Sequence, residues 1–200
     1  MSGLFSDRTL RCCVVVFGCL AAFLFGTAMA VFPGETYNPA MRMLSALGHS
    51  VIAGEKCPLC HQLFVFGMVS SALASVIAFI MCRDFVSGIR RNVLNCGAAL
   101  NFVGLLTIAA APEDISMFWH NAGCHLAAVG GCAALFALNG KAAERWWTYL
   151  LLSVFAIFSL TIVLHTFKAI PFAPAVPSMQ KLVILSFAAW VIRIQRKSGV

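Results

Sequence analysis

The chain alternates long apolar runs with short polar segments, a pattern typical of helices that cross a membrane. About 20 apolar residues are needed to span roughly 30 Å of hydrocarbon as an α-helix. Spanning helices are predicted at residues 12–32, 63–82, 93–111, 117–138, 146–166 and 179–194. The sixth run is the weakest, because Lys181 near its start would have to extend its ammonium group to the membrane surface. We expect an all-α, polytopic transmembrane bundle of six spans, with five as the alternative.

The longest segment between predicted spans is residues 33–62. It opens with a Pro33-Gly34 turn and contains a helix-like stretch, residues 40–52, that is too short to span. We expect an outer loop with an interfacial or re-entrant helix. The first span ends at Ala28-Met29-Ala30, which also fits a signal-peptide cleavage site, but we expect this span to be retained.

Lysine and arginine predict the orientation, because cytoplasmic loops carry an excess of them. With the N-terminus inside, ten cationic residues fall inside and four outside. The inner residues are Arg8, Arg11, Arg83, Arg90, Arg91, Lys141, Arg145, Arg193, Arg196 and Lys197, and the outer ones are Arg42, Lys56, Lys168 and Lys181. Both termini are therefore expected in the cytoplasm.

Composition supports a single membrane domain over residues 1–200. The chain is 61% hydrophobic and 10% charged, with a mean hydropathy of +0.92, whereas a soluble domain is typically about 25% charged. The net charge is +7, but no basic run is interleaved with exposed aromatic residues, so nucleic-acid binding is excluded. Membrane lipids are the expected partners, and the chain could form a homo-oligomer or join a membrane complex.

Under this topology the reactive side chains gather on the outer side. Ionisable groups at membrane depth are costly and by default mark a site or a water-filled cavity. We favour a shared site over five separate packing histidines. The outer histidines are His49, His61, His120, His125 and His165, and the outer acidic residues include Glu35, Glu55, Glu113 and Asp114.

Residues 112–125 bring acid, imidazole and thiol to the mouth of the fourth predicted helix. Asp114 can cap this helix, since a carboxylate accepts hydrogen bonds from its first amides. His120 and His125 point to different sides of the helix, so they could hold an ion only with a third group. A zinc site would draw on His49, His120, His125 and His165.

The outer loop ends in Cys57-Pro58-Leu59-Cys60-His61. The spacing fits a small structural disulfide, which we place first. It also fits a redox-active thiol pair, or covalent attachment of a c-type haem with His61 as axial ligand.

Three sets of residues match a known pattern: Tyr37-Asn38-Pro39 with Leu44-Ser45-Ala46-Leu47-Gly48, Gly104-Leu105-Leu106 with Pro112, Asp114 and His120, and Trp190 with Arg193. In these residues the chain resembles the domain-of-unknown-function 998 family, six-helix membrane proteins of bacteria and archaea similar to the Frag1/DRAM/Sfk1 proteins. The resemblance implies a six-helix bundle in the cytoplasmic (inner) membrane, and the family's biochemical role is unassigned. Ala46 stands where the family often has an acidic residue, so no carboxylate role transfers there.

Three functions remain open from the sequence. The first is a hydrolase or transferase acting on lipid or lipid-linked substrates, in which Asp114 orients His120 and His120 activates Ser45 or a water. The second is a redox or haem protein using the cysteine pair. The third is a non-catalytic lipid-binding protein, scaffold or small transporter, consistent with small residues along the fourth helix that permit close packing.

Overall fold

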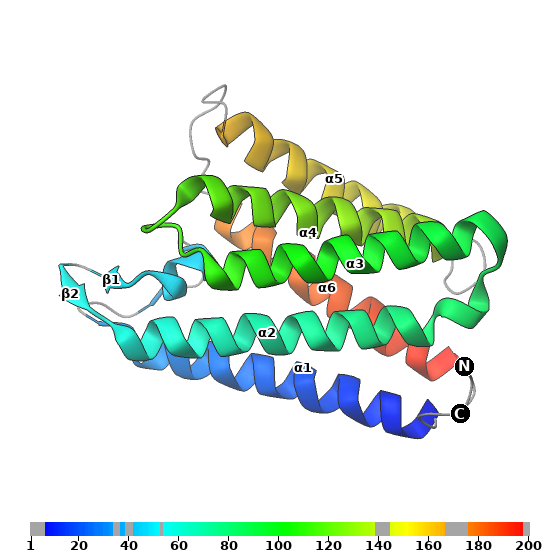
Figure 1. The fold of residues 1–200 in the computed structure, drawn as a ribbon, viewed down its shortest axis with the longest axis horizontal. Coiled ribbons are helices and arrows are strands. Elements are labelled where there is room, and N and C mark those ends of the chain that lie inside the picture. Colours follow the sequence, from blue (N-terminus) through cyan, green and yellow to red (C-terminus); the bar gives the residue numbers. More distant parts are fainter. Residues whose placement is uncertain are drawn as a thin grey trace.

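Six long helices run back and forth along a roughly common axis (Figure 1). The computed structural model describes residues 7–33, 37–38, 42–52, 54–138, 145–166 and 176–197. Consecutive helices pack against one another. The helices are α1 (Asp7–Ala30), α2 (Pro58–Met81), α3 (Gly88–Ala110), α4 (Met117–Leu138), α5 (Arg145–Thr166) and α6 (Val176–Lys197).

The two ends of the bundle differ. At one end, which we call the terminal end, α1 begins, α6 ends and the short 3₁₀ helix η2 (Arg83–Phe85) joins α2 to α3 (Figure 1). The opposite end, the cap end, carries the 3₁₀ helix η1 (Leu44–Gly48), the strands β1 (Val51–Ile52) and β2 (Glu55–Lys56), and the turn between α3 and α4.

Four of the described helical segments are long and apolar enough to cross a membrane. They are Arg8–Ala30, Pro58–Phe85, Gly88–Ala110 and Met117–Leu138. α5 contributes a shorter apolar stretch, Leu152–Thr161. Large apolar side chains such as Phe23, Phe66 and Phe136 face outward, which is stable in lipid and unfavourable in water. The protein is therefore an all-α, multi-pass membrane protein, as the apolar runs predicted.

The loop between α1 and α2 differs from the prediction. Instead of a helix over residues 40–52, the described part of this stretch contains only the five-residue η1, followed by the hairpin of β1 and β2. The strands pair with Ile52 opposite Glu55, and Gly54 turns the hairpin with a φ of +84°, a conformation that costs glycine little. The hairpin leads directly into α2, which begins at Pro58 because proline suits the first helical position.

α3 and α4 form the tightest seam of the bundle. A Cβ placed on Gly97 would lie 2.7 Å from both the Ala134 nitrogen and the Gly130 carbonyl oxygen. Gly104 faces Ala127 and Gly123 in the same way. Membrane helices use small residues in this manner, because backbone contact replaces the hydrophobic driving force that lipid removes.

A buried polar link crosses the same seam. The Asn101 amide donates to the Ala127 carbonyl of α4 at 2.9 Å, and its Oδ1 lies 3.0 Å from the Ser75 hydroxyl of α2. Asn101 is 8% exposed and Ser75 6%. Because an unpaired polar group is costly in an apolar interior, this link fixes how α2, α3 and α4 sit against each other.

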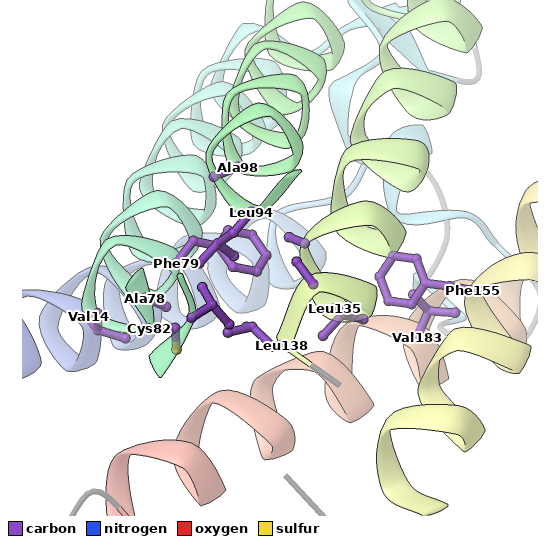
Figure 2. Close-up of a cluster of buried hydrophobic side chains, with 13 residues drawn as sticks. Val14, Ala78, Phe79, Cys82, Leu94, Ala98, Leu135, Leu138, Phe155 and Val183 are labelled. Carbon is purple, nitrogen blue, oxygen red and sulfur yellow. The ribbon is translucent and has the colours of Figure 1, made fainter. Parts of the chain in front are cut away.

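One apolar cluster toward the terminal end joins all six long helices (Figure 2). A second cluster lies beneath the cap end, where Phe64 of α2 packs against Gly48 of η1. The labelled members of the first cluster are Val14 of α1, Ala78, Phe79 and Cys82 at the end of α2, Leu94 and Ala98 of α3, Leu135 and Leu138 of α4, Phe155 of α5, and Val183 of α6.

Candidate functional site: the polar cap

The turn between α3 and α4 presents two adjacent carboxylates to the loop between α1 and α2. The buried Pro112 shapes this turn, because its carbonyl accepts hydrogen bonds from the amides of Ile115 at 3.1 Å and Ser116 at 2.9 Å. Glu113 and Asp114 lie inside the turn and contact different parts of the loop. We call these two residues and the loop groups they bind the polar cap.

Asp114 holds the start of the hairpin. Its Oδ2 accepts hydrogen bonds from the Ser50 amide at 2.8 Å, the Ser50 hydroxyl at 2.7 Å and the Val51 amide at 3.3 Å. Loss of hydrating water acts to raise the pKa of the Asp114 carboxylate, but these hydrogen bonds outweigh it and lower the pKa. The predicted N-cap was wrong, because α4 begins at Met117 and the Asp114 carboxylate binds the loop between α1 and α2 instead.

Glu113 holds η1 and the residue after it. Its Oε2 accepts a hydrogen bond from the Ser45 hydroxyl at 3.3 Å and lies 3.6 Å from His49 Nε2. The second distance is slightly long for a hydrogen bond, so we describe the contact as an ion pair. The Glu113 carboxylate raises the pKa of His49 against the opposing effect of burial, and His49 in turn lowers the pKa of Glu113.

His120 lies behind the carboxylates at the start of α4 and is 4% exposed. Its Nδ1 is 2.9 Å from the carbonyl oxygen of Ala111 at the end of α3. Since a carbonyl can only accept, Nδ1 carries the proton in this contact. A positive charge on His120 also lowers the pKa of Glu113, so the ring is close to the cap without a described hydrogen bond to it.

The structure brings Ser45, Asp114 and His120 to the same end of the bundle but gives each a different described partner. Ser45 pairs with Glu113, Asp114 with Ser50 and Val51, and His120 with a backbone carbonyl. Sequence reasoning missed the central role of Glu113. The available signal was its position beside Asp114 in one turn, which brings both carboxylates to the same loop.

A second set of contacts ties the loop to α6. Lys181 Nζ donates to the Arg42 carbonyl at 2.6 Å, and Gln180 Oε1 accepts the Leu44 amide at 2.7 Å. The Tyr37 hydroxyl lies 3.1 Å from the same Arg42 carbonyl and 2.9 Å from that of Met43. Burial raises the pKa of Tyr37 to about 12, so its hydroxyl stays protonated as a donor. No local sequence pattern predicts these contacts.

The described zinc candidates, His49, His120 and His125, are not gathered into a metal site. No group of three or more His, Cys, Asp or Glu side chains in the described part of the chain could hold a metal ion. His49 pairs with Glu113, His120 with a backbone carbonyl, and His125 is partly buried on α4. The side chain of His165 and all of Glu35 lie outside the described residues.

Cys57, Cys60 and His61 lie at the junction between the hairpin and α2. In the structure Cys57 and Cys60 are free thiols, so it describes the reduced form of the pair for which the sequence placed a disulfide first. Cys60 is 0% exposed, and its sulfur lies 3.4 Å from the Val31 carbonyl oxygen. His61 Nδ1 is 2.8 Å from the Gly48 carbonyl oxygen. These residues do not fit covalent haem, because a fully buried Cys60 leaves no room for a thioether bond to a porphyrin.

Fold and cap together define the class as an all-α, multi-pass membrane protein with a polar cap at one end. No protein-family model, curated protein or solved structure matches the chain. The resemblance to the 998 family therefore stays a prediction. Its motif residues Tyr37, Ser45, Asp114 and His120 all lie at the cap end, whereas the side chains of Trp190 and Arg193 are outside the described residues.

Proposed function

We propose that this chain is a non-catalytic, six-span membrane protein of the lipid-binding or scaffold type. Its polar cap is a clasp that holds the loop between α1 and α2 on the helix bundle. The observation that carries the proposal is that two adjacent carboxylates from one turn bind the loop at Ser45, His49, Ser50 and Val51. The polar groups suited to chemistry are thus engaged in joining one element to another.

The state of Ser45 argues against a serine nucleophile. Such a serine needs a nearby base that takes its proton and must be open to substrate. The Ser45 hydroxyl donates to Glu113, whose lowered pKa makes it a weaker base, and Ser45 is only 5% exposed. The imidazole of His49 contacts the same Glu113 oxygen, Oε2, and not the Ser45 hydroxyl.

The positions of the arginines support placing the polar cap on the outer side of the membrane. Arginines that predict cytoplasmic loops, Arg8, Arg83 and Arg90, lie at the terminal end in α1, η2 and α3. This end also holds the start of α1 and the end of α6, so both termini would be cytoplasmic (Figure 1). The resemblance to the 998 family adds the proposal of a bacterial or archaeal cytoplasmic membrane.

Exposed apolar side chains beside the cap support contact with lipid. Ile115, Met117, Phe118 and Trp119 follow the carboxylates directly, and all four are exposed. The Phe118 and Trp119 rings meet edge to face with centroids 5.2 Å apart. Aromatic residues concentrate where hydrocarbon meets headgroups, so this segment would anchor the cap end at the outer membrane interface.

A serine-reactive fluorophosphonate probe tests the proposal on the full-length protein in membranes. We expect no labelling that depends on Ser45, and a lower thermal midpoint for Ser45→Ala. Ser71→Ala is the matched control, since that hydroxyl donates to a carbonyl within its own helix at 2.9 Å. Labelling that is lost in S45A and kept in S71A would overturn the non-catalytic reading.

That outcome would favour the second candidate, a metal-free hydrolase. One observation supports it: a hydroxyl, a carboxylate and an imidazole meet at the Oε2 atom of Glu113. In such an enzyme Glu113 would accept the Ser45 proton and His49 would protonate the leaving group. The substrate would be a lipid or lipid-linked ester, because the site lies beside the membrane interface.

A further inference from the structure

Cys57 and Cys60 form a pair of neighbouring thiols at the start of α2. Cys57 directly precedes the helix and Cys60 lies in its first turn. The His61 amide donates to the Cys57 carbonyl at 3.1 Å, so the two cysteines span the first turn of the helix. Cys57 is 8% exposed and Cys60 is 0% exposed, so a reaction partner would reach Cys57 first.

The surroundings of the pair connect three elements. The Cys60 thiol lies 3.6 Å from the Ala28 carbonyl oxygen and 3.4 Å from that of Val31, at the end of α1. The Cys57 amide donates to the Ser50 carbonyl at 3.1 Å. Ser50 is the residue that Asp114 holds, so the thiols lie next to the polar cap.

We propose that Cys57 and Cys60 are a dithiol–disulfide modification site that reacts with a protein disulfide of the oxidising compartment. Cys57 is the attacking thiol, because it is the less buried of the two. This proposal goes beyond the clasp function of the polar cap. It rests on one part of the proposed function, that the cap end lies on the outer side of the membrane.

The reaction has two exchange steps. The Cys57 thiolate attacks one sulfur of the partner disulfide, forming a mixed disulfide and releasing the other partner sulfur as a thiolate. The Cys60 thiolate then attacks the Cys57 sulfur and releases the second partner sulfur. The two cysteines lose two electrons and two protons, and the partner disulfide is reduced to a dithiol.

Oxidation has a structural consequence at the α1–α2 contact. In the dithiol state the Cys60 S–H can donate to the Ala28 carbonyl of α1 or to the carbonyl of Val31, the residue after α1. A disulfide sulfur has no proton to donate, so these contacts are lost. The oxidation state of the pair therefore changes how the end of α1 is held against α2.

The test counts free thiols in full-length protein from cells quenched in acid, denatured and alkylated with N-ethylmaleimide. Intact mass should show two fewer adducts than the nine cysteines, and all nine after reduction. Cys57→Ser should carry adducts on every remaining cysteine without reduction. The control Cys82→Ser removes a buried thiol at the other end of α2 and should keep the two-adduct difference.

Two results would overturn the proposal. The first is full alkylation of all nine cysteines before reduction. The second is a two-adduct difference that persists in Cys57→Ser, which would assign the disulfide to other cysteines.

Discussion

Replacing Asp114 with alanine should open the hairpin without unfolding the bundle. Its carboxylate receives three hydrogen bonds from Ser50 and Val51, at 2.7 to 3.3 Å. A hydrogen bond to a charged group contributes about 1.5–3 kcal/mol. Asp114 is exposed, so water replaces part of each bond, and we expect a net loss of about 1.5–3 kcal/mol for the set.

Hydrogen–deuterium exchange measures this loss at the residues concerned. Since about 1.4 kcal/mol corresponds to a tenfold change in an equilibrium constant, the Ser50 and Val51 amides should exchange roughly 10- to 100-fold faster in D114A. Amides in the middle of α2 and α3 should be unchanged. Asp114→Asn keeps an acceptor oxygen and should give an intermediate rate.

Asp84→Ala is the matched control. Asp84 is also an acidic residue in a connection between helices, but its side chain is 96% exposed and its ion pair with Arg91 is 4.0 Å long. Such a pair contributes little to stability. The reasoning is refuted if D114A leaves the Ser50 and Val51 amides as protected as in the wild type, or if D84A exposes them equally.

Three further predictions concern the cap and the bundle. The His49–Glu113 pair requires charged His49, whose pKa is raised, and charged Glu113, whose pKa is lowered. The pair therefore stabilises the protein fully between the ordinary pKa values of Glu and His. This stabilisation is lost as pH rises through the His49 pKa or falls through the Glu113 pKa. The difference in thermal midpoint between wild type and His49→Gln should therefore shrink from pH 6 to pH 8. Gly130→Ala should lower the unfolding free energy in a denaturant titration by about 1–3 kcal/mol or more, since its Cβ would overlap the α3 backbone. Gly131→Ala should cost less, because its Cβ would meet side chains alone, the Phe155 ring at 3.3 Å and the Asn101 amide nitrogen at 3.5 Å; equal costs would contradict the close α3–α4 packing. Asn101→Ala should cost about 1–3 kcal/mol in the same titration, because it removes the two buried hydrogen bonds from α3 to Ser75 and Ala127. An unchanged midpoint would show that the link is not needed.

The sequence predicted the class and much of the helix layout because apolar length is a local property. The fourth predicted helix, Met117–Leu138, has the same bounds in the structure. The start of α2 was placed five residues late, at Leu63, because the polar residues His61 and Gln62 masked the helix start that Pro58 provides. The predicted loop helix failed because amide groups bind Asp114 and Gln180 instead of forming helical turns.

The sequence predicted which residues gather at the candidate site better than it predicted which of them contact one another. Ser45, Asp114 and His120 were placed at one end of the bundle from topology, and the structure gathers them there. Ser45 contacts Glu113 rather than Asp114 because of the turn that Pro112 shapes. The spacing of residues in the sequence does not predict this choice. The contact between Leu44 and Gln180 joins residues 136 positions apart, so it follows only from how α6 packs.

The central claim, that the cap is a structural clasp, is tested most directly by a double-mutant cycle on Ser45→Ala and Glu113→Ala. The unfolding free energies of wild type, both single variants and the double variant would be measured in one detergent. A clasp predicts that S45A destabilises the protein and that the two changes are non-additive by about 0.5–3 kcal/mol. An active site predicts that S45A is as stable as the wild type or more stable, because replacing a catalytic residue commonly leaves stability unchanged or increases it. A stable S45A variant whose change in unfolding free energy adds to that of Glu113→Ala would contradict the clasp.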